Sequence, residues 1–359
     1  MKINFHAPIV IADGYGSASC NILLWMDKLG IDVYPVNMYP SNTNPKTLPP
    51  RLLELMNREE QPGDLMYYVN PAFAKFNPRY EGQQIVVMSM LETTKVPKHW
   101  VERYNEVALI HNPSQWGKNI FETSGVKVPI EVKNLGVPPE KIYYVERDFD
   151  VPFVFLFVTT EVNDSRKNAM MLVESFVDAF GDNPDVELWI KTKVNWKWPV
   201  PENDNIVIIE GEATLEEMDD IMARANCFVF PTRSEGFGLP PLEAMATGCP
   251  VIATNYSSMT EFLSDEVAYL LDIEGMEDID QETPTLTGLH NYPVPIFGDD
   301  IGQWSIPSKR HLSELMVEVW ENYDAALERG INAFSMVEEE WGYDKKVSKI
   351  ITSLERLLI

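Results

Sequence analysis

The sequence predicts an α/β protein of two domains, each built on a parallel sheet with helices on both faces. Three observations support this prediction. Short, continuously apolar runs such as Phe153–Val158 are typical of strands buried on both faces. Segments with apolar residues at helical spacing alternate with these runs along the chain. The chain has 359 residues, more than one ordinary domain, and 45% of them are hydrophobic, which is enough for two cores.

Domain boundaries are expected where these patterns break. We expect a first domain over residues 1–150, a second over residues 151–335 and a C-terminal helix over residues 336–359, with a linker near residues 146–152. Strands are expected at Lys2–Ile11, Ile31–Val36, Asp64–Val69, Gln84–Met88, Val107–Ile110, Phe153–Val158, Glu187–Ile190, Asn205–Ile209, Cys227–Phe230 and Val251–Ala253.

The chain is strongly acidic. Lys and Arg number 29 against 55 Asp and Glu, a formal net charge of −26. Duplex DNA and anionic membranes need a basic footprint, so a nucleic-acid acceptor is disfavoured, although a local basic groove is compatible with an acidic total.

Targeting signals and cysteine usage favour a cytoplasmic protein. No apolar run reaches the length of a membrane span, and Met1–Cys20 lacks the features of a signal peptide. The three cysteines, Cys20, Cys227 and Cys249, form no CxxC pair and no zinc spacing. Two of them lie in apolar runs, which fits small core residues in a reducing compartment.

The most informative stretch runs from Ser234 to Asn255, SEGFGLPPLEAMATGCPVIATN. It follows the apolar run Cys227–Phe230, and Gly236 and Gly238 allow a tight turn and the close approach of a ligand. A proline in the first helical turn and Gly248 at the end bound a short helix. Amides of this turn would lie at a helix N-terminus, a place suited to phosphate. They belong to Phe237, Gly238 and Leu239.

Two carboxylates bracket this turn, Glu235 before the glycines and Glu243 within the helix. An ionised carboxylate only accepts hydrogen bonds and can take two from vicinal hydroxyls, so it suits a ribose or a sugar rather than a phosphate. A phosphate site beside two hydroxyl acceptors indicates a nucleotide-sugar site. The alternative is a capped surface helix with ordinary glutamates.

Glu235 and Glu243, with seven residues between them in GFGLPPLEAMATGCPVIAT, resemble the E-x7-E signature of retaining glycosyltransferases of family 4, the group 1 type. The similarity covers most of the second domain and the first only loosely. It implies the GT-B fold: two Rossmann-like domains facing a cleft, with the C-terminal helix crossing back to the first. It also implies that Glu243 binds ribose hydroxyls, that Glu235 lies at the donor sugar, and that the amides of Gly236–Leu239 hold sugar and diphosphate oxygens.

Basic residues lie where a donor diphosphate is expected. Arg166 and Lys167 stand at the start of a helix that Asp164 or Ser165 is expected to cap. Cations at a helix N-terminus oppose the dipole, so an anion is expected to offset them. The resemblance assigns Lys167 to the diphosphate. A solvated basic pair is the alternative.

The resembled family usually has an arginine near residues 159–161, and this sequence has none there. Either Arg166 or Arg233 is expected to take its place. Lys191, at the C-terminal end of a predicted strand, is a second candidate cation for the phosphates.

The first domain offers weaker candidates. Gly14 and Gly16 are expected in a loop before a helix that starts at Ala18, and the resemblance turns this loop toward the donor phosphates. A plain strand-to-helix turn is the alternative. Glu92 and His111 follow or end predicted strands and are candidate acceptor contacts. A solvated loop glutamate and a structural histidine are the alternatives.

The end of the chain carries no predicted metal site. Residues 274–307 are interpreted as a long loop or a partly ordered insertion, and His311–Leu327 as one amphipathic helix. Two DxD triplets, at residues 148–150 and 278–280, lie away from the nucleotide features and are interpreted as chance matches.

The combined prediction is an enzyme, a hexosyltransferase that moves a sugar from a nucleoside-diphosphate sugar to an acceptor hydroxyl. The resemblance implies retention of anomeric configuration, and the basic residues predict transfer without a metal or other cofactor. One alternative is a sugar phosphorylase or nucleotide-sugar epimerase on the same fold. Another is a non-catalytic nucleotide-sugar-binding protein.

Overall fold

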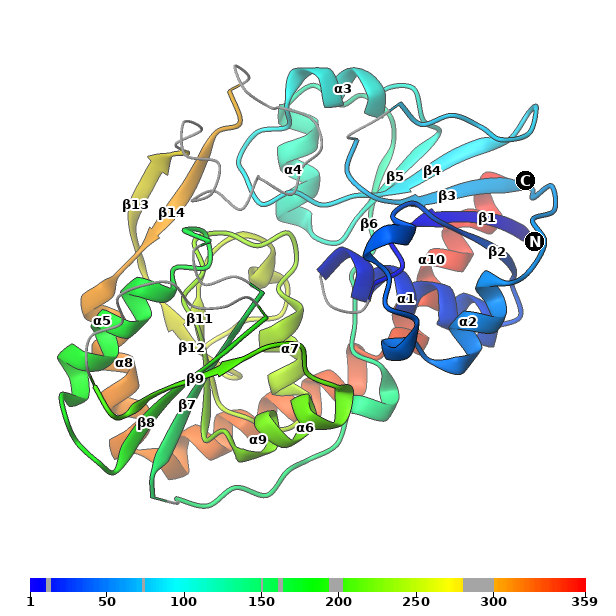
Figure 1. Cartoon of the computed structure of the whole chain (residues 1–359). Helices are drawn as coiled ribbons and strands as arrows, with labels where there is room; N and C mark the ends of the chain where they lie inside the picture. The colour runs from blue at the N-terminus through cyan, green and yellow to red at the C-terminus, as the bar shows by residue number, and fades with distance from the viewer. Residues whose placement is uncertain (11–13, 73–74, 150, 161–163, 194–202, 280–299) are drawn as a thin grey trace. The chain divides into compact units, whose positions relative to one another are not determined.

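The predicted architecture is confirmed: the described residues form two six-stranded parallel sheets, each with helices on both faces (Figure 1). The computed structural model describes residues 1–10, 14–72, 75–149, 151–160, 164–193, 203–279 and 300–359. Within them, unit 1 comprises residues 1–139, 300–301 and 341–359, and unit 2 comprises residues 140–279 and 302–340. The boundaries at residues 150 and 335 stay a prediction of where separately folding domains end.

The sheet of unit 1 has the strand order β2-β1-β3-β4-β5-β6. Its strands are β1 (Lys2–Ala7), β2 (Asp32–Asn37), β3 (Leu65–Val69), β4 (Gln84–Met88), β5 (Leu109–Asn112) and β6 (Ile130–Val132). Its helices are α1 (Gly14–Lys28), α2 (Pro50–Met56), α3 (Lys98–Tyr104), α4 (Gln115–Thr123) and α10 (Tyr343–Leu357). In Figure 1, α3 and α4 lie on the opposite side of this sheet from α1, α2 and α10.

Helix α1 starts earlier than the sequence predicts. Gly14–Ser17 form its first turn rather than a loop, so the predicted helix start at Ala18 was wrong. Glycine destabilises a helix through the backbone entropy that it loses, a cost that applies chiefly to the helix interior, so two glycines in the first turn are tolerated. Gly16 and Ala18 are buried.

Helix α10 belongs to unit 1, where it packs against α1. Ser353 of α10 donates a hydrogen bond of 2.7 Å to Glu131 of β6, and its hydroxyl lies 3.0 Å from Nε2 of His111 in β5. The last helix of the chain therefore completes the core of the first unit.

The sheet of unit 2 has the order β12-β11-β10-β7-β8-β9. Its strands are β7 (Phe153–Thr159), β8 (Val186–Thr192), β9 (Ile206–Glu210), β10 (Cys227–Phe230), β11 (Val251–Thr254) and β12 (Tyr269–Leu271). Its helices are α5 (Ala169–Phe180), α6 (Leu215–Arg224), α7 (Leu239–Met245), α8 (Lys309–Glu321) and α9 (Tyr323–Glu340). The central strands β7 and β10 are almost entirely buried and rich in phenylalanine, as expected for a sheet covered on both faces.

The structure bears on two sequence predictions about the end of unit 2: it contradicts the single helix, and it shows ordered strands where a long loop or a partly ordered insertion was predicted. The predicted loop contains an antiparallel pair, β13 (Ile273–Asp278) with β14 (Gln303–Pro307), whose pairing joins segments far apart in sequence. The predicted single helix His311–Leu327 is broken at Asn322 into α8 and α9. The apolar period continues across the break, so periodicity alone cannot reveal it.

Strand order in unit 2 locates a switch point in its sheet. From β7 the chain passes to β8 and β9 on one side and later to β10, β11 and β12 on the other. The order therefore reverses between the neighbouring strands β7 and β10. In open parallel sheets, ligands bind at the carboxyl ends of the strands flanking such a switch point.

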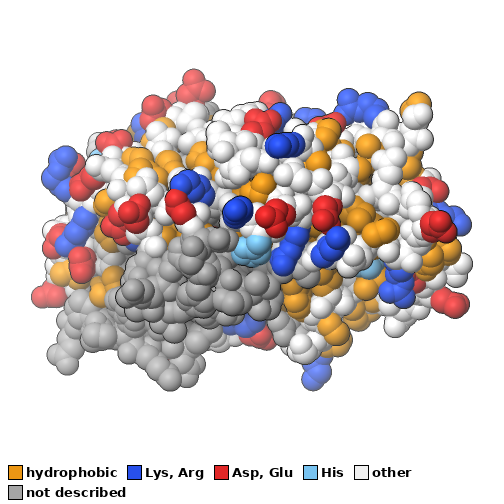
Figure 2. All heavy atoms as spheres, turned by 90° about the horizontal axis from the view of Figure 1, so that it is seen from above, with side chains coloured by type: hydrophobic (Ala, Val, Ile, Leu, Met, Phe, Trp, Pro, Cys, Tyr) orange, Lys and Arg blue, Asp and Glu red, His pale blue; other side chains and the backbone are white. Residues whose placement is uncertain are grey.

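The described surface shows no marked separation of charge on the face drawn in Figure 2, where acidic and basic side chains lie interspersed. Among the described helices, none combines the length and the hydropathy that a membrane span requires.

Candidate functional site

The switch point of unit 2 brings together two segments that follow β7 and β10. The first contains Arg166 and Lys167, and the second runs from Pro231 to Gly238. Their backbones are joined by a hydrogen bond of 2.8 Å from the amide of Arg233 to the carbonyl of Arg166. The predicted catalytic residues therefore lie in neighbouring segments.

Glu235 accepts from both predicted phosphate cations. Its Oε1 lies 2.7 Å from Nζ of Lys167 and 2.8 Å from Nη1 of Arg166. Arg166 also donates to the carbonyl of Ser234 at 2.9 Å, and the ammonium of Lys167 lies 5.0 Å from the centre of the Phe230 ring. Arg166 forms a longer ion pair with Asp164 as well, with Nη2 3.5 Å from Oδ2, so Glu235 offsets Lys167 fully and shares Arg166 with Asp164.

The ionisation of Glu235 follows from this geometry. Its side chain is buried, and burial alone would raise the pKa of Glu235. The charges and hydrogen bonds of Arg166 and Lys167 outweigh burial and hold that pKa below its ordinary value. The carboxylate is therefore ionised at neutral pH and can act only as a hydrogen-bond acceptor.

The cap of the helix that follows was predicted wrongly. Helix α5 begins at Ala169, and its N-cap is Asn168 in the left-handed conformation at φ 61°, not Asp164 or Ser165. Asp164 instead accepts from the amide of Arg166 at 2.9 Å. This local turn competes with the helix, so Arg166 and Lys167 precede α5 rather than forming its first turn.

Ser257 is a site residue that sequence reasoning missed. Its hydroxyl accepts from the amide of Glu235 at 2.9 Å. Ser257 is buried and has φ 60°, a conformation rare outside glycine. Neither the serine nor its spacing of 22 residues from Glu235 gives a sequence signal for this contact.

The turn after Glu235 has the geometry that the sequence predicts. Gly238 has φ 94° and precedes α7, and a β-carbon there would lie 2.7 Å from Cγ of Met259. Glycine is therefore required both for the backbone conformation and for space. Within the described residues, the amides of Gly236, Gly238 and Leu239 donate to no backbone or side-chain acceptor. Phe237 is buried in the same turn.

Glu243 contrasts with Glu235. It lies on α7, its side chain is exposed, and it makes no hydrogen bond or ion pair with a described residue. Its side chain has no protein hydrogen bond to lose when a ligand's hydroxyls bind. The surrounding protein nevertheless raises the pKa of Glu243, chiefly by removing solvent from around the carboxyl group.

Of the two arginines considered as substitutes for the missing one, Arg166 contacts Glu235 and Arg233 does not. Arg233 donates from Nε to the carbonyl of Ser305 at 3.1 Å and pairs with Glu277, so it holds the β13–β14 pair. The geometry favours Arg166 for the predicted role.

Lys191 lies at the C-terminal end of β8 and is buried. Its ammonium donates to the carbonyls of Gly211 and Thr192, and burial lowers the pKa of Lys191. Its predicted contact with a phosphate stays a prediction and would require these hydrogen bonds to be exchanged.

The remaining candidates lie in unit 1. Gly14 and Gly16 are in the first turn of α1, and Glu92 is half-buried after β4. His111 is fully buried, with Nδ1 3.0 Å from the Tyr67 hydroxyl and Nε2 3.0 Å from the Ser353 hydroxyl. Burial lowers the pKa of His111 to about 3. These contacts favour the alternative of a structural histidine that the sequence left open.

No group of three or more His, Cys, Asp or Glu side chains suited to a metal occurs in the part of the chain that the structure describes. Of the two DxD triplets, Asp150 and Asp280 lie outside the described residues.

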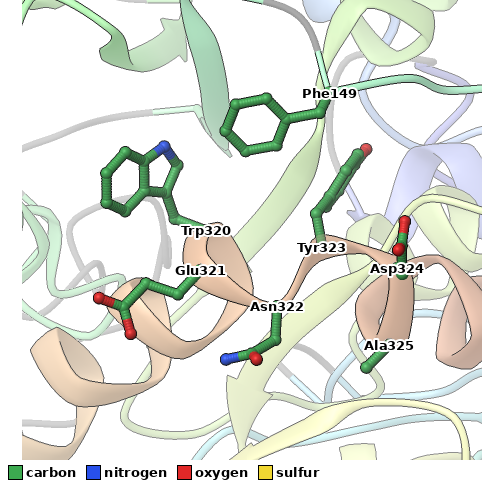
Figure 3. Close-up of a pocket in the computed structure, with 7 residues that line it drawn as sticks. All are labelled: Phe149, Trp320, Glu321, Asn322, Tyr323, Asp324 and Ala325. Atoms are coloured by element: carbon green, nitrogen blue, oxygen red, sulfur yellow. The ribbon is translucent and has the colours of Figure 1, made fainter.

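A hollow of about 660 Å³ lies elsewhere in unit 2, at the junction of α8 and α9 (Figure 3). Phe149, Trp320 and Tyr323 line it together with polar side chains. Phe149 and Tyr323 contact Phe153, the first residue of β7, so the hollow lies at the amino end of that strand. Parallel sheets bind ligands at the carboxyl ends, so this hollow is not the candidate site.

Solved structures share the whole fold. Anabaena Alr3699/HepE, solved with UDP and glucose, matches 99% of this chain and 100% of its own with a TM-score of 0.68 at 13% identity. Sucrose-phosphate synthase from Thermosynechococcus elongatus matches 99% of both chains with a TM-score of 0.70 at 13% identity. The protein therefore has the GT-B fold.

The sequence comparisons match only part of the chain. Residues 152–281 match the family model described as Glycosyl transferases group 1. The lipopolysaccharide core biosynthesis mannosyltransferase LpsB of Rhizobium meliloti is 40% identical over 78 residues, 20% of this chain and 22% of that protein. The O-antigen chain mannosyltransferase RfbU of Salmonella typhimurium is 28% identical over 108 residues, 27% of this chain and 31% of that protein. The matched segments thus span less than a third of these relatives. The family-model match makes unit 2 similar to group 1 glycosyl transferases.

Proposed function

We propose that the protein is a retaining glycosyltransferase that moves a hexosyl group from a nucleoside-diphosphate sugar to an acceptor hydroxyl without a metal. The observation that carries the proposal is the contact of Glu235 with Arg166 and Lys167 at the switch point of a GT-B unit. This contact places a carboxylate that can accept hydrogen bonds from hydroxyls next to two cations that can bind phosphate, so one nucleotide-sugar molecule could reach all three groups.

Each group has a role that its geometry allows. Arg166, Lys167 and the amides after Glu235 bind the diphosphate, and the exposed Glu243 binds the ribose hydroxyls. Glu235 accepts hydrogen bonds from the donor sugar. Positioning of the two substrates and stabilisation of charge on the departing diphosphate supply the rate acceleration. The leaving phosphate accepts the proton of the attacking hydroxyl.

Similar proteins limit the choice of donor sugar. Several similar curated proteins are named mannosyltransferases, and Alr3699/HepE was solved with UDP-glucose. We therefore infer a mannosyl or glucosyl donor. The three free, buried cysteines support a reducing, cytoplasmic compartment for the reaction.

The first experiment is a screen of UDP-, GDP- and ADP-linked mannose and glucose for thermal stabilisation of the protein. A true donor at a hundred times its Kd stabilises the folded protein by about 2.7 kcal/mol. Transfer to a hydroxyl acceptor is then followed by NMR, which reports whether the anomeric configuration is retained. Stabilisation by none of these nucleotide sugars contradicts the proposal.

Metal independence is tested in the same assay. EDTA is expected to leave the rate of transfer unchanged, because Arg166, Lys167 and backbone amides offset the phosphate charge. Loss of transfer in EDTA with recovery in Mn²⁺ or Mg²⁺ contradicts this part of the proposal.

A further inference from the structure

The cations at Glu235 are already neutralised within the protein. Both Lys167 and Arg166 point at one oxygen of Glu235, and the three side chains are only 9–14% exposed. Charges this far from water interact strongly, and separating them leaves each one poorly solvated. An incoming anion must therefore compete with Glu235 for both cations, and with Asp164 for Arg166.

The proposed function makes a diphosphate that anion. A diphosphate carries more negative charge than one carboxylate and offers more acceptor oxygens, so it can displace Glu235. The displaced carboxylate is still buried and needs new hydrogen-bond donors. The hydroxyls of the donor hexose supply such donors, whereas a nucleoside diphosphate lacks this hexose and its ribose hydroxyls are assigned to Glu243.

We propose that Glu235 is an internal competitor of the donor diphosphate for Arg166 and Lys167, and that its displacement frees the carboxylate to bind the donor sugar. The site thereby favours the intact nucleotide sugar over the nucleoside diphosphate left after transfer. Return of Glu235 to the two cations helps to expel that product. This inference rests on the proposed function.

The test is the affinity for a nucleoside diphosphate, measured by calorimetry. UDP and GDP are first compared on wild type, and the one that binds more tightly is then used for all variants. Glu235→Gln keeps the shape of the side chain and removes its charge, so the Kd of the nucleoside diphosphate is expected to fall at least tenfold. The affinity for the nucleotide sugar should increase less, because the uncharged amide of the variant cannot form charge-assisted hydrogen bonds with the sugar hydroxyls. The matched control is Glu314→Gln, which removes a glutamate paired with Arg310 on α8 of the same unit and is expected to leave the Kd unchanged.

A Kd that is unchanged or raised in Glu235→Gln overturns the inference, as does an equal fall in Glu314→Gln. If Glu235→Gln does not fold, Glu235→Asp replaces it. Shortening the side chain withdraws the carboxylate from the cations, so a smaller fall in Kd is expected, and an unchanged Kd counts against the competition. If wild type transfers sugar but Glu235→Gln does not bind the nucleoside diphosphate more tightly, the competition is refuted and the proposed function is not. If neither wild type nor any variant binds a nucleotide, the proposed function is refuted as well.

Discussion

At the scale of the residue, the two glutamates of the candidate site differ in what surrounds them. Glu235 is buried against two cations, whereas the exposed Glu243 has no hydrogen-bond or ion-pair partner among the described residues. The sequence predicts both as ligand-binding groups from their spacing. It cannot predict their environments, because the partners of Glu235 lie 68 and 69 positions away. Those contacts exist only once β7 and β10 are neighbours.

Glu243→Gln is expected to raise the KM for the donor about tenfold and to leave kcat nearly unchanged, because ribose binding is uniform through the reaction. The side chain makes no hydrogen bond or ion pair within the described protein, so the folded state should be as stable as wild type. Steady-state kinetics with varied donor measures both constants. A large loss of kcat at unchanged KM would show that Glu243 acts in the chemical step instead.

His111 gives a prediction for pH. The pKa of His111 in the folded protein is about 3, lowered first by burial and then by Lys133, whereas an unfolded histidine titrates near 6.5. Between these values the unfolded state binds the extra proton, so His111 makes the protein less stable as pH falls from about 6.5 to about 3. The slope approaches about 1.4 kcal/mol per pH unit.

Chemical denaturation across this pH range, with wild type and His111→Gln compared, measures the effect. The variant is expected to be less stable near pH 7 through weakened hydrogen bonds to Tyr67 and Ser353. Its free energy of unfolding should then depend less steeply on pH. Equal slopes in the two proteins would mean that His111 is protonated in the folded state.

At the scale of the element, local patterns predict the strands well and the ends of helices poorly. β4 and β10 have the predicted bounds because a short apolar run between polar residues marks a buried strand. The start of α5 was missed because Asp164 binds the backbone before the helix begins. The β13–β14 pair was missed because strand pairing across 280–299 leaves no local signal.

The turn into α7 allows a prediction with an internal control. Gly238→Ala combines a left-handed backbone at φ 94° with a β-carbon 2.7 Å from Met259, and is expected to cost about 2–5 kcal/mol of unfolding free energy. Gly211→Ala has the same left-handed strain at φ 103° but open space around the β-carbon, and should cost about 1–2 kcal/mol.

Urea denaturation of both variants measures this difference. Because Met259 follows the strand next to β10, a shift of Met259 also moves the turn whose amides are proposed to bind phosphate. Gly238→Ala should therefore weaken nucleotide binding, while Gly211→Ala has no steric reason to do so. Equal losses of stability in the two variants would show that the contact with Met259 relaxes freely.

At the scale of the whole molecule, the acidity belongs to one stretch of the chain. Residues 140–340 contain 12 Lys and Arg against 40 Asp and Glu, whereas residues 1–139 and 341–359 together contain 17 against 15. The two differences, −28 and +2, add to the net charge of −26. The stretch that contains unit 2 is therefore strongly acidic, and the anionic donor proposed above would approach it through a repulsive long-range field that Arg166 and Lys167 reverse only at the candidate site.

This distribution predicts an unusual response to salt. Long-range fields act on the rate of association, and salt screens them, with a Debye length that falls from about 30 Å at 0.01 M to about 8 Å at 0.15 M. The association rate constant of a nucleoside diphosphate should therefore rise several-fold over this range, as measured by stopped-flow mixing. Replacing Glu338, Glu339 and Glu340 of α9 by Gln removes three negative charges and should reduce the rise. A rate that falls as salt is added would mean that Arg166 and Lys167, not the net charge of unit 2, govern the approach of the donor.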